Sequence, residues 1–114
     1  MTVQIAAYGR LGADPVQRQS QAGKPWATAS MAVQIAEGDD APPQWFQIVA
    51  FGRVAELLAR QAKGDLLSVA GRLQLNRWQD HDGTAHERLQ IVADTVISAR
   101  SARPHGGKRR EAGE

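Results

Sequence analysis

Alternation with a period of two residues constrains the fold of this chain more than any other feature of its sequence. Side chains of a strand point in turn to opposite faces, so an alternating run separates a core face from an outer face. In Gln44–Phe51 the predicted core face is Phe46, Ile48 and Ala50, and the outer face is Trp45, Gln47, Val49 and Phe51. In the run 67–78 the predicted core residues are Leu67, Val69, Leu73 and Leu75. The outward residues of that run are Ser68, Ala70, Arg72, Gln74, Asn76 and Trp78.

The outer faces of these two runs therefore carry aromatic rings among polar and cationic side chains. Rings that stack on unpaired bases, with cations between them for the phosphates, are typical of surfaces that bind single-stranded nucleic acid. A tryptophan taken alone is more often buried than exposed. The outward position of Trp45 and Trp78 reverses that expectation, so both are predicted to stack bases, and Phe51 is the third candidate.

The net charge of +2 conceals an asymmetry between the body of the chain and its end. Residues 1–99 contain nine Lys or Arg and ten Asp or Glu, whereas residues 100–114 contain five and two. Because the body is nearly neutral, local placement of cations must matter more than bulk charge. The body cations predicted to contact phosphate are Arg10, Arg18, Lys24, Arg53, Arg72 and Arg77.

Length and composition indicate one domain over residues 1–99, followed by a basic and disordered tail over 100–114. The absence of cysteine excludes disulfides and thiolate metal sites. The N-terminal residues lack the pattern of a signal peptide, and no apolar stretch is long enough for a membrane helix. We therefore expect neither export nor membrane insertion.

The order of the predicted elements favours an all-β fold. Strands are expected at Thr2–Tyr8, from Ala27 to Ile35, and at Gln44–Phe51, Leu66–Trp78 and Leu89–Val96. The glycines of 9–12 predict a bend or bulge at the end of the first strand. Asp14 and Pro15 predict a turn, and Gly71 predicts a bulge in a long curved strand. An amphipathic helix with a buried stripe of Val54, Leu57 and Leu58, and Gln61 nearby, is expected to end at Lys63 and Gly64. Five strands with one helix between strands three and four predict an OB-fold, a five-stranded Greek-key barrel.

Four segments in this order resemble bacterial single-stranded DNA-binding proteins (SSB). They are the opening GRLGADP (9–15) with GKP (23–25), the strand-to-helix segment WFQIVAFGRVAE (45–56), KGD (63–65) with VAGRL (69–73), and the hairpin WQDHDG (78–83). The resemblance covers about residues 3–96. It implies a cytoplasmic, non-enzymatic protein that coats single-stranded DNA during replication, repair, recombination or plasmid transfer, as a homotetramer or, second, a dimer. It also implies base stacking by Trp45, Phe51 and Trp78, with Arg53 and Lys63 near the strand.

The sequence departs from this family at three places. The region Ala36–Gly38 lacks an aromatic that many members have, and Trp26 occupies a position that is usually small or aliphatic. Trp26 is either a replacement stacking residue or part of a subunit contact. The chain ends in KRREAGE rather than an acidic tip finishing in Phe, so recruitment of other DNA enzymes through such a tip is not expected.

Other functions remain as alternatives. Exposed aromatics also mark protein interfaces, so a protein-interaction module serving a primosome or conjugation is the second hypothesis, and an RNA-binding OB protein of cold-shock type is the third. A hydrolase comes last because no nucleophile and base pair stands out. Asp80, His81, Asp82 and His86 crowd one predicted hairpin with its turn at residues 80–83. Asp is favoured in turns for conformational reasons, and the four residues match no metal motif. No metal or cofactor is expected.

Overall fold

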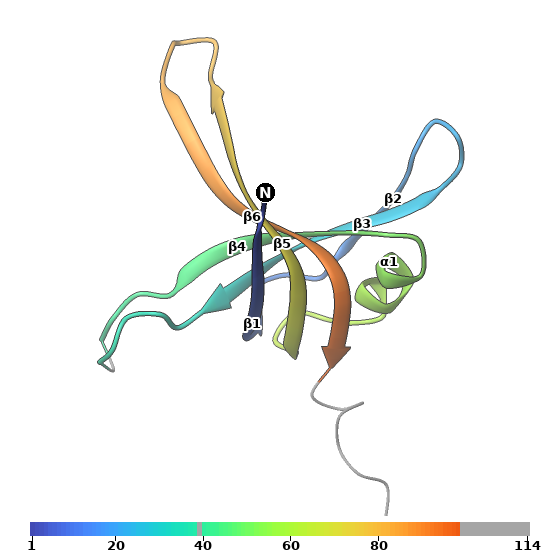
Figure 1. The fold of residues 1–114 in the computed structure, drawn as a ribbon, viewed down its shortest axis with the longest axis horizontal. Helices are drawn as coiled ribbons and strands as arrows, with labels where there is room; N and C mark the ends of the chain where they lie inside the picture. The colour runs from blue at the N-terminus through green and yellow to red at the C-terminus, as the bar shows by residue number, and fades with distance from the viewer. Residues whose placement is uncertain (39, 99–114) are drawn as a thin grey trace, which may run out of the picture.

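The computed structural model describes residues 1–38 and 40–98, so the predicted domain boundary at residue 99 and the basic tail lie outside the described residues. Its elements in chain order are β1 (Val3–Leu11), β2 (Val16–Gln19), β3 (Pro25–Val33), β4 (Gln44–Phe51), α1 (Gly52–Ala59), β5 (Leu66–Gln79) and β6 (Ala85–Ser98) (Figure 1). The one helix of this part lies between β4 and β5, as predicted. It has neither the length nor the hydrophobicity to cross a membrane.

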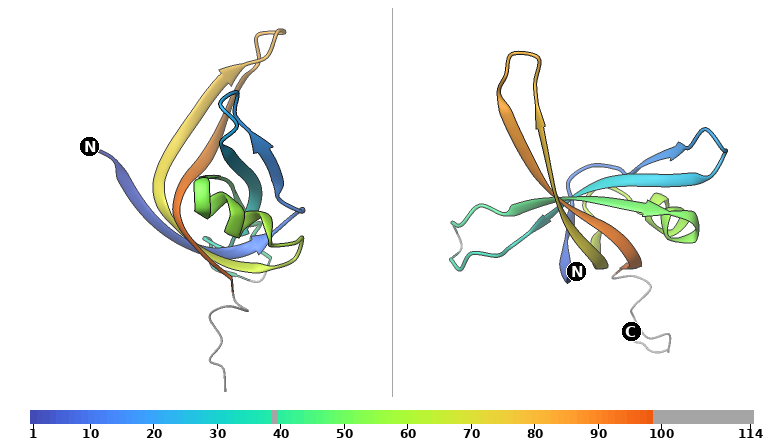
Figure 2. Two further views of the ribbon diagram at one scale, coloured as in Figure 1. Left: turned by 90° about the vertical axis from the view of Figure 1, so that its right-hand side faces the viewer. Right: turned by 45° about the horizontal axis from the view of Figure 1, so that its top comes forward.

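The strands close into a barrel. They follow the order β1-β5-β6-β4-β3, and β1 returns to pair with β3 through Arg10 and Leu11. Neighbouring strands of this ring are antiparallel except for β4 and β6. α1 packs against β3, β4 and β6 and faces the viewer in the left panel of Figure 2. The predicted five-stranded OB barrel is thus confirmed, with β2 as an additional strand on the edge of β3.

The core consists of the inward residues that the alternation predicts, together with the apolar face of α1. β4 has the bounds predicted from the sequence, and its core face is Phe46, Ile48 and Ala50. Of the predicted core residues of β5, Leu67 and Val69 are fully buried and Leu73 packs against the core while half-buried. The other buried members are Leu11, Ala27, Ala29, Met31, Ala55, Leu58, Ile91, Ala93 and Val96.

The structure corrects the expectations for the N-terminal third. β1 does not stop at Tyr8 but continues to Leu11, which is buried, and the expected bend follows at Gly12 and Ala13. Gly9 serves a close approach instead, because a Cβ there would lie 2.3 Å from the carbonyl oxygen of Ala32. The segment Val16–Gln19, for which no strand was predicted, forms β2, which is exposed throughout and so shows no apolar alternation. Ile35, expected as the last residue of the second strand, lies exposed beyond the end of β3 (Pro25–Val33).

Two further expectations need correction around the helix and the long hairpin. α1 ends at Ala59, before the predicted end at residues 63 and 64, and its buried residues are Ala55 and Leu58 while Leu57 is exposed. Leu75 was predicted as core but is 46% exposed. Its cross-strand partner Leu89 is half-buried and packs against the core, so the core covers the β6 side of this pair but leaves Leu75 exposed. The β5–β6 hairpin projects away from the barrel beyond this region (Figure 1).

The predicted irregularity at Gly71 is present, but the extra residue is on the partner strand. The register passes from Ala70–Thr95 to Gly71–Ala93, which leaves Asp94 of β6 as the bulged residue. The inward positions of β6 change parity at this point, from Ile91 and Ala93 to Val96 and Ser98. The bulge therefore lets both long strands keep their apolar side chains inside a curved barrel.

Candidate nucleic-acid interface

The outer face of β4, β6 and β5 gathers the predicted aromatic residues. The register places Gln47 of β4 beside Gln90 of β6, and Gln90 beside Gln74 of β5, so the outward residues of the three strands form one surface. Trp45 is 49% exposed and Trp78 40% exposed on this surface. Phe51, at the far end of β4, is 57% exposed, whereas Val49, which lies between Trp45 and Phe51 on the same strand, is buried. The outward positions predicted for the three aromatics are therefore confirmed.

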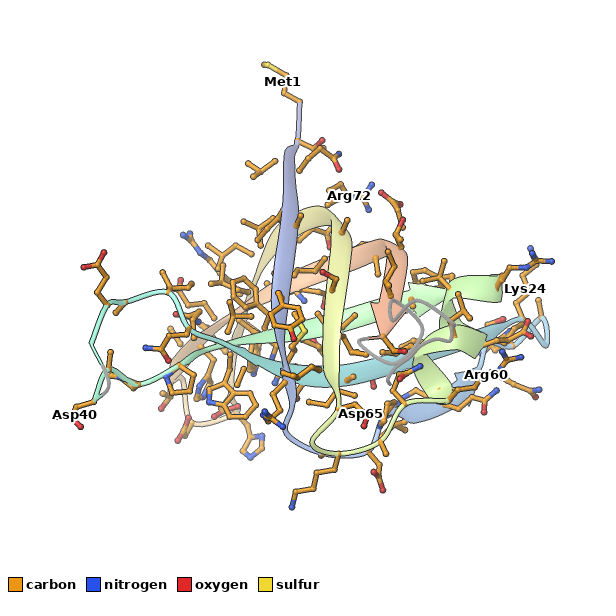
Figure 3. All side chains as sticks on the ribbon, turned by 90° about the horizontal axis from the view of Figure 1, so that it is seen from below. Met1, Lys24, Asp40, Arg60, Asp65 and Arg72 are labelled. Carbon is orange, nitrogen blue, oxygen red and sulfur yellow. The ribbon has the colours of Figure 1, made fainter. Side chains whose placement is uncertain are left out.

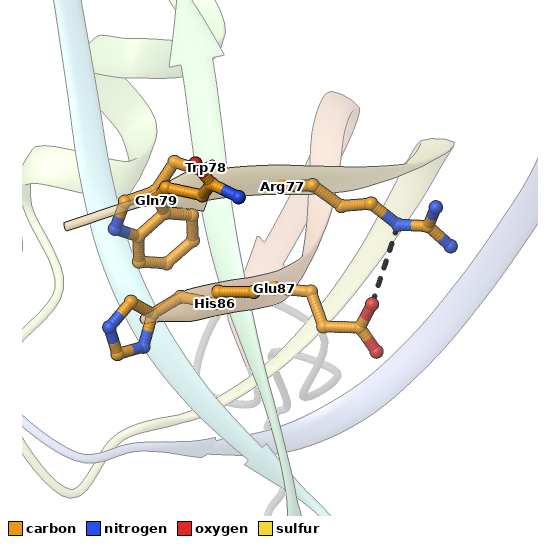
Figure 4. Close-up of a pocket in the computed structure, with 6 residues that line it drawn as sticks. Arg77, Trp78, Gln79, His86 and Glu87 are labelled. Atoms are coloured by element: carbon orange, nitrogen blue, oxygen red, sulfur yellow. Dashed lines mark ion pairs between the residues drawn. The ribbon is translucent and has the colours of Figure 1, made fainter. Parts of the chain in front are cut away.

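Trp78 lies in the β5–β6 hairpin, where two side chains of β6, His86 and Arg88, lie next to its ring. Its ring is nearly parallel to that of His86, with centroids 5.3 Å apart and an interplanar angle of 20°. The guanidinium carbon of Arg88 lies 5.0 Å from the Trp78 centroid. Figure 4 shows Trp78 and His86 on one side of the hairpin, with a cavity of about 570 Å³ lined by both. The hairpin thus presents a ring beside a cation, which suits a base and its phosphate.

Arg88 connects Trp78 to Trp45, and sequence reasoning missed it. Its Nη1 donates a hydrogen bond of 3.0 Å to Oε1 of Gln47. Trp45, Gln47 and Arg88 also line one small cavity of about 170 Å³. The returning strand was expected to begin at Leu89, so Arg88 lay outside every predicted strand and its side chain was assigned to no face. A search for outward cations on a longer strand would have found it.

An amide network supports the surface between the two tryptophans. Nδ2 of Asn76 donates to Oε1 of Gln90 over 2.7 Å, and Nε2 of Gln90 donates to Oε1 of Gln74 over 3.1 Å. These side chains are half-buried. Because each long side chain has a partner across the strands, the surface is held in one arrangement before any ligand binds.

Gly12 makes room for Trp45. A Cβ on Gly12 would lie 2.6 Å from the outer edge of the Trp45 ring, while the N–H of Gly12 donates to the carbonyl of Ser30 over 3.0 Å. The end of β1 thus packs directly beneath the indole. The contact with Trp45 explains why residue 12 is glycine, although its backbone conformation is open to other residues.

A second aromatic group lies where β2, β3 and β4 meet. Trp26 of β3 is paired with Phe51 of β4, and their rings are 6.4 Å apart at 23°. The guanidinium carbon of Arg18 lies 5.6 Å from the Trp26 centroid. Lys24 joins both rings in the lining of a cavity of about 720 Å³. Two predicted cations, Arg18 and Lys24, therefore lie close to Trp26, for which the sequence predicts either base stacking or a subunit contact.

The remaining predicted cations are dispersed. Arg10 donates to the carbonyl of Gly64 over 2.7 Å, and Arg77 forms an ion pair of 3.4 Å with Glu87, on the other side of the hairpin from Trp78 (Figure 4). Arg53 is exposed near the start of α1, and Lys63 is exposed in the loop after it.

Arg72, on β5, lies well apart from Lys24 at the β2–β3 hairpin (Figure 3). The contacts of the dispersed cations with phosphate remain predictions.

The hairpin turn beside Trp78 holds several ionisable side chains. The backbone N–H of Thr84 donates to Oδ1 of Asp82 over 2.9 Å, and this bond, with a second from the Thr84 side chain, lowers the pKa of Asp82. The carboxylate of Asp80 contacts Nε2 of His86. Within residues 1–38 and 40–98, no three His, Asp or Glu side chains are grouped so as to hold a metal ion.

Comparison with known proteins agrees with this geometry. The model of the Single-strand binding protein family matches residues 2–98. A single-stranded DNA-binding protein of Thermosynechococcus vestitus is 36% identical over 106 residues, which cover 89% of this chain and 88% of that protein. One from Caldanaerobacter subterraneus is 32% identical over 100 residues, which cover 84% and 67%.

The fold also matches a solved structure. The crystal structure of a small single-stranded DNA-binding protein from Streptomyces coelicolor superposes with a TM-score of 0.74, over 86% of this chain and 94% of that one. The two sequences are 22% identical, so this likeness concerns the fold.

Proposed function

Since the chain belongs to the single-strand binding protein family, we propose that it binds single-stranded DNA without catalysis and with little sequence preference. The observation that carries this proposal is the surface on which Trp45 and Trp78 are both exposed and Arg88 lies between them. Successive bases stack on Trp45, Phe51 and Trp78, and cations hold the phosphates. The strands it protects are those exposed in the cytoplasm during replication, repair, recombination or plasmid transfer.

The magnitude of stacking agrees with such a role. Each base stacked on an aromatic side chain contributes about 1–3 kcal/mol, so three rings contribute on the order of 3–9 kcal/mol before ordering costs. Micromolar binding requires about 8 kcal/mol, so one domain binds weakly and several joined domains bind tightly. Duplex DNA binds poorly because its bases are already stacked on one another.

Tryptophan fluorescence tests the proposal. Oligo-dT should quench the protein, and duplex DNA should not compete. Trp78→Ala should weaken binding by about 5- to 150-fold, the equivalent of one stacked base. Leu75→Ala is the matched control, because Leu75 is exposed in the same hairpin but points to the other face. Tighter binding of a matched RNA would favour an RNA-binding protein. No quenching by any nucleic acid would leave the aromatics as a surface for a protein partner.

We propose further that the protein is a homotetramer. Tyr8 of β1, Ser68 of β5 and Ile97 of β6 are paired across the sheet and share its outer face, where Tyr8 and Ile97 are exposed. Exposed apolar groups in one row favour contact with another copy. Light scattering should give four times the 12.4 kDa of one chain, and Tyr8→Glu should lower that mass. A mass of one chain for the unaltered protein would exclude the oligomer.

A further inference from the structure

Two aromatic sites lie on the same outer face of the sheet. We name Trp45, Trp78 and Arg88 the central site, and Trp26, Phe51, Arg18 and Lys24 the hairpin site. Cross-strand pairing places Trp26, Thr28 and Ser30 of β3 beside Phe51, Val49 and Gln47 of β4, so one face runs continuously from one site to the other. The strip between the sites contains no charged side chain in these rows.

The hairpin site has the chemistry of a base-binding site in its own right. Its cavity of about 720 Å³ is within the size range of small-molecule sites. Trp26 and Phe51 supply nearly parallel rings, and Lys24 is the one charged residue of the lining, which includes no carboxylate. Arg18 lies over the Trp26 ring. A flat apolar group attached to an anion is complementary to this combination, and a nucleotide has that form.

The spacing of the two sites determines how one strand can occupy both. Trp45 and Phe51 are the ends of a six-residue step along β4, which spans about 20 Å at about 3.3 Å per residue. A stacked nucleic-acid strand advances about 3.4 Å per nucleotide, so at most about six nucleotides cover this distance. A strand shorter than that step reaches one site only.

We propose that the hairpin site is a second base-stacking site, filled by the same DNA strand that occupies the central site once that strand is long enough to span both. This inference rests on the proposed function and adds to it a site centred on Trp26 and a length threshold. Above the threshold, the second contact is intramolecular, so affinity rises through effective concentration. Below it, the two sites fill independently.

Single-tryptophan proteins test this directly, because the chain contains three tryptophans in all. The double variant Trp45→Phe, Trp78→Phe leaves Trp26 as the reporter, and Trp26→Phe, Trp45→Phe leaves Trp78. Phenylalanine retains a ring for stacking at the altered positions. Each protein is titrated with oligo-dT of about three and about twelve nucleotides, lengths that lie below and above the estimated span. The longer strand should quench both reporters at one midpoint, and the shorter strand should give two different midpoints.

A loss-of-function variant provides a second measurement. Trp26→Ala should weaken binding of the longer strand by about 5- to 150-fold, with little change for the shorter strand at the Trp78 reporter. Gln17→Ala is the control, since Gln17 is exposed on β2 but its pairing with Ala27 places it on the opposite face. Thermal unfolding of each variant shows whether the fold is retained, and Trp26→Leu replaces Trp26→Ala if it is not.

Three results would overturn the inference. If no length of DNA quenches Trp26 while Trp78 is quenched, Trp26 is not a base-stacking residue, and binding of single-stranded DNA at the central site stands. If neither reporter is quenched, the proposed function itself fails. If Trp26→Ala lowers the mass measured by light scattering and leaves DNA affinity unchanged, the hairpin site is a contact between copies of the chain.

Discussion

Arg88 contacts the ring of Trp78 and lines a cavity together with Trp45, so it joins two separately predicted aromatic residues in one surface. Its guanidinium is planar and carries several N–H donors, so it can lie over the Trp78 ring and donate to Gln47 at the same time. The Gln47 hydrogen bond holds the guanidinium beside the cavity that Arg88 lines together with Trp45. Neither the charge nor the ring contact alone explains this arrangement, because lysine would supply the first without the planar geometry of the second.

At this scale we expect Arg88→Ala to weaken binding of oligo-dT and to reduce the slope of log affinity against log salt by about 0.7, the value for neutralising one phosphate fewer on a single strand. Arg88→Lys should restore the slope but not the full affinity, since it keeps the charge and removes the planar donor. Arg60→Ala removes the same charge just after α1 and is the control. An unchanged slope for Arg88→Ala would show that Arg88 does not contact phosphate. The same measurement tests Arg72 and Arg77.

Among the elements, the paired strands β5 and β6 combine two different environments. Near the barrel, the bulge at Asp94 opposite Gly71 lets them curve around the core. Toward their turn they project as a hairpin (Figure 1), in which Trp78 is exposed and its ring stacks on His86 of the same hairpin. The barrel end therefore contributes to stability, and the projecting end contributes the binding surface.

Glycine substitutions should separate these two contributions. A Cβ at Gly71 would lie 2.1 Å from the carbonyl oxygen of Val92, which is backbone and cannot move alone. Gly71→Ala should therefore lower the free energy of unfolding by about 1–3 kcal/mol. Gly12→Ala is the comparison, because its Cβ meets only the far edge of the Trp45 ring, which can move away. This variant should change the quenching of tryptophan fluorescence by DNA and lower the free energy of unfolding less than Gly71→Ala does. Denaturant unfolding of both variants checks this, and equal decreases in stability would contradict it.

The turn of the same hairpin has a pH dependence set by Asp82. Hydrogen bonds from Thr84 lower the pKa of Asp82 in the folded hairpin below its usual value of 3.8. A carboxylate with a depressed pKa stabilises the fold above the unfolded value and loses that contribution as the pH falls through the folded value. The Thr84 amide resonance should therefore titrate with a midpoint below 3.8, and the titration should be absent in Asp82→Ala. A midpoint at or above that value would show that the turn does not favour the ionised form.

For the whole molecule, charge and base stacking contribute unequally to the affinity for DNA. Residues 1–99 have one more acidic than basic residue, and residues 100–114 have three more basic than acidic residues. Binding by the barrel must therefore depend on rings and a few placed cations rather than on a general positive field.

Removing residues 100–114 should consequently reduce the salt dependence of DNA binding and leave the maximum tryptophan quenching unchanged. All three tryptophans lie in the part that remains, and five cations are removed. Affinity for oligo-dT measured at several salt concentrations checks both statements. A decrease in quenching would mean that the tail is needed for the stacked complex itself.

Much of the fold follows from local pattern, and the errors occur where local pattern carries no information. β4 was predicted to its terminal residues because both of its faces are distinct in the sequence. β2 was missed because all four of its residues are exposed and because, among the described strands, it pairs with β3 alone. Leu75 was assigned to the core because alternation cannot show where a hairpin leaves the barrel.

Period-two alternation determined from the sequence alone which side chains of β4 face outward, and it placed Trp45 and Phe51 there; in β5 it did the same for Trp78. Only the tertiary structure decided which outward residues become neighbours. Arg88 meets Trp78 and Gln47 because the bulged β6 lies between β4 and β5 in one register, and Trp26 meets Phe51 because β3 pairs with β4. The physical reason is that alternation is a property of each strand by itself, whereas register depends on how all the strands close around a common core.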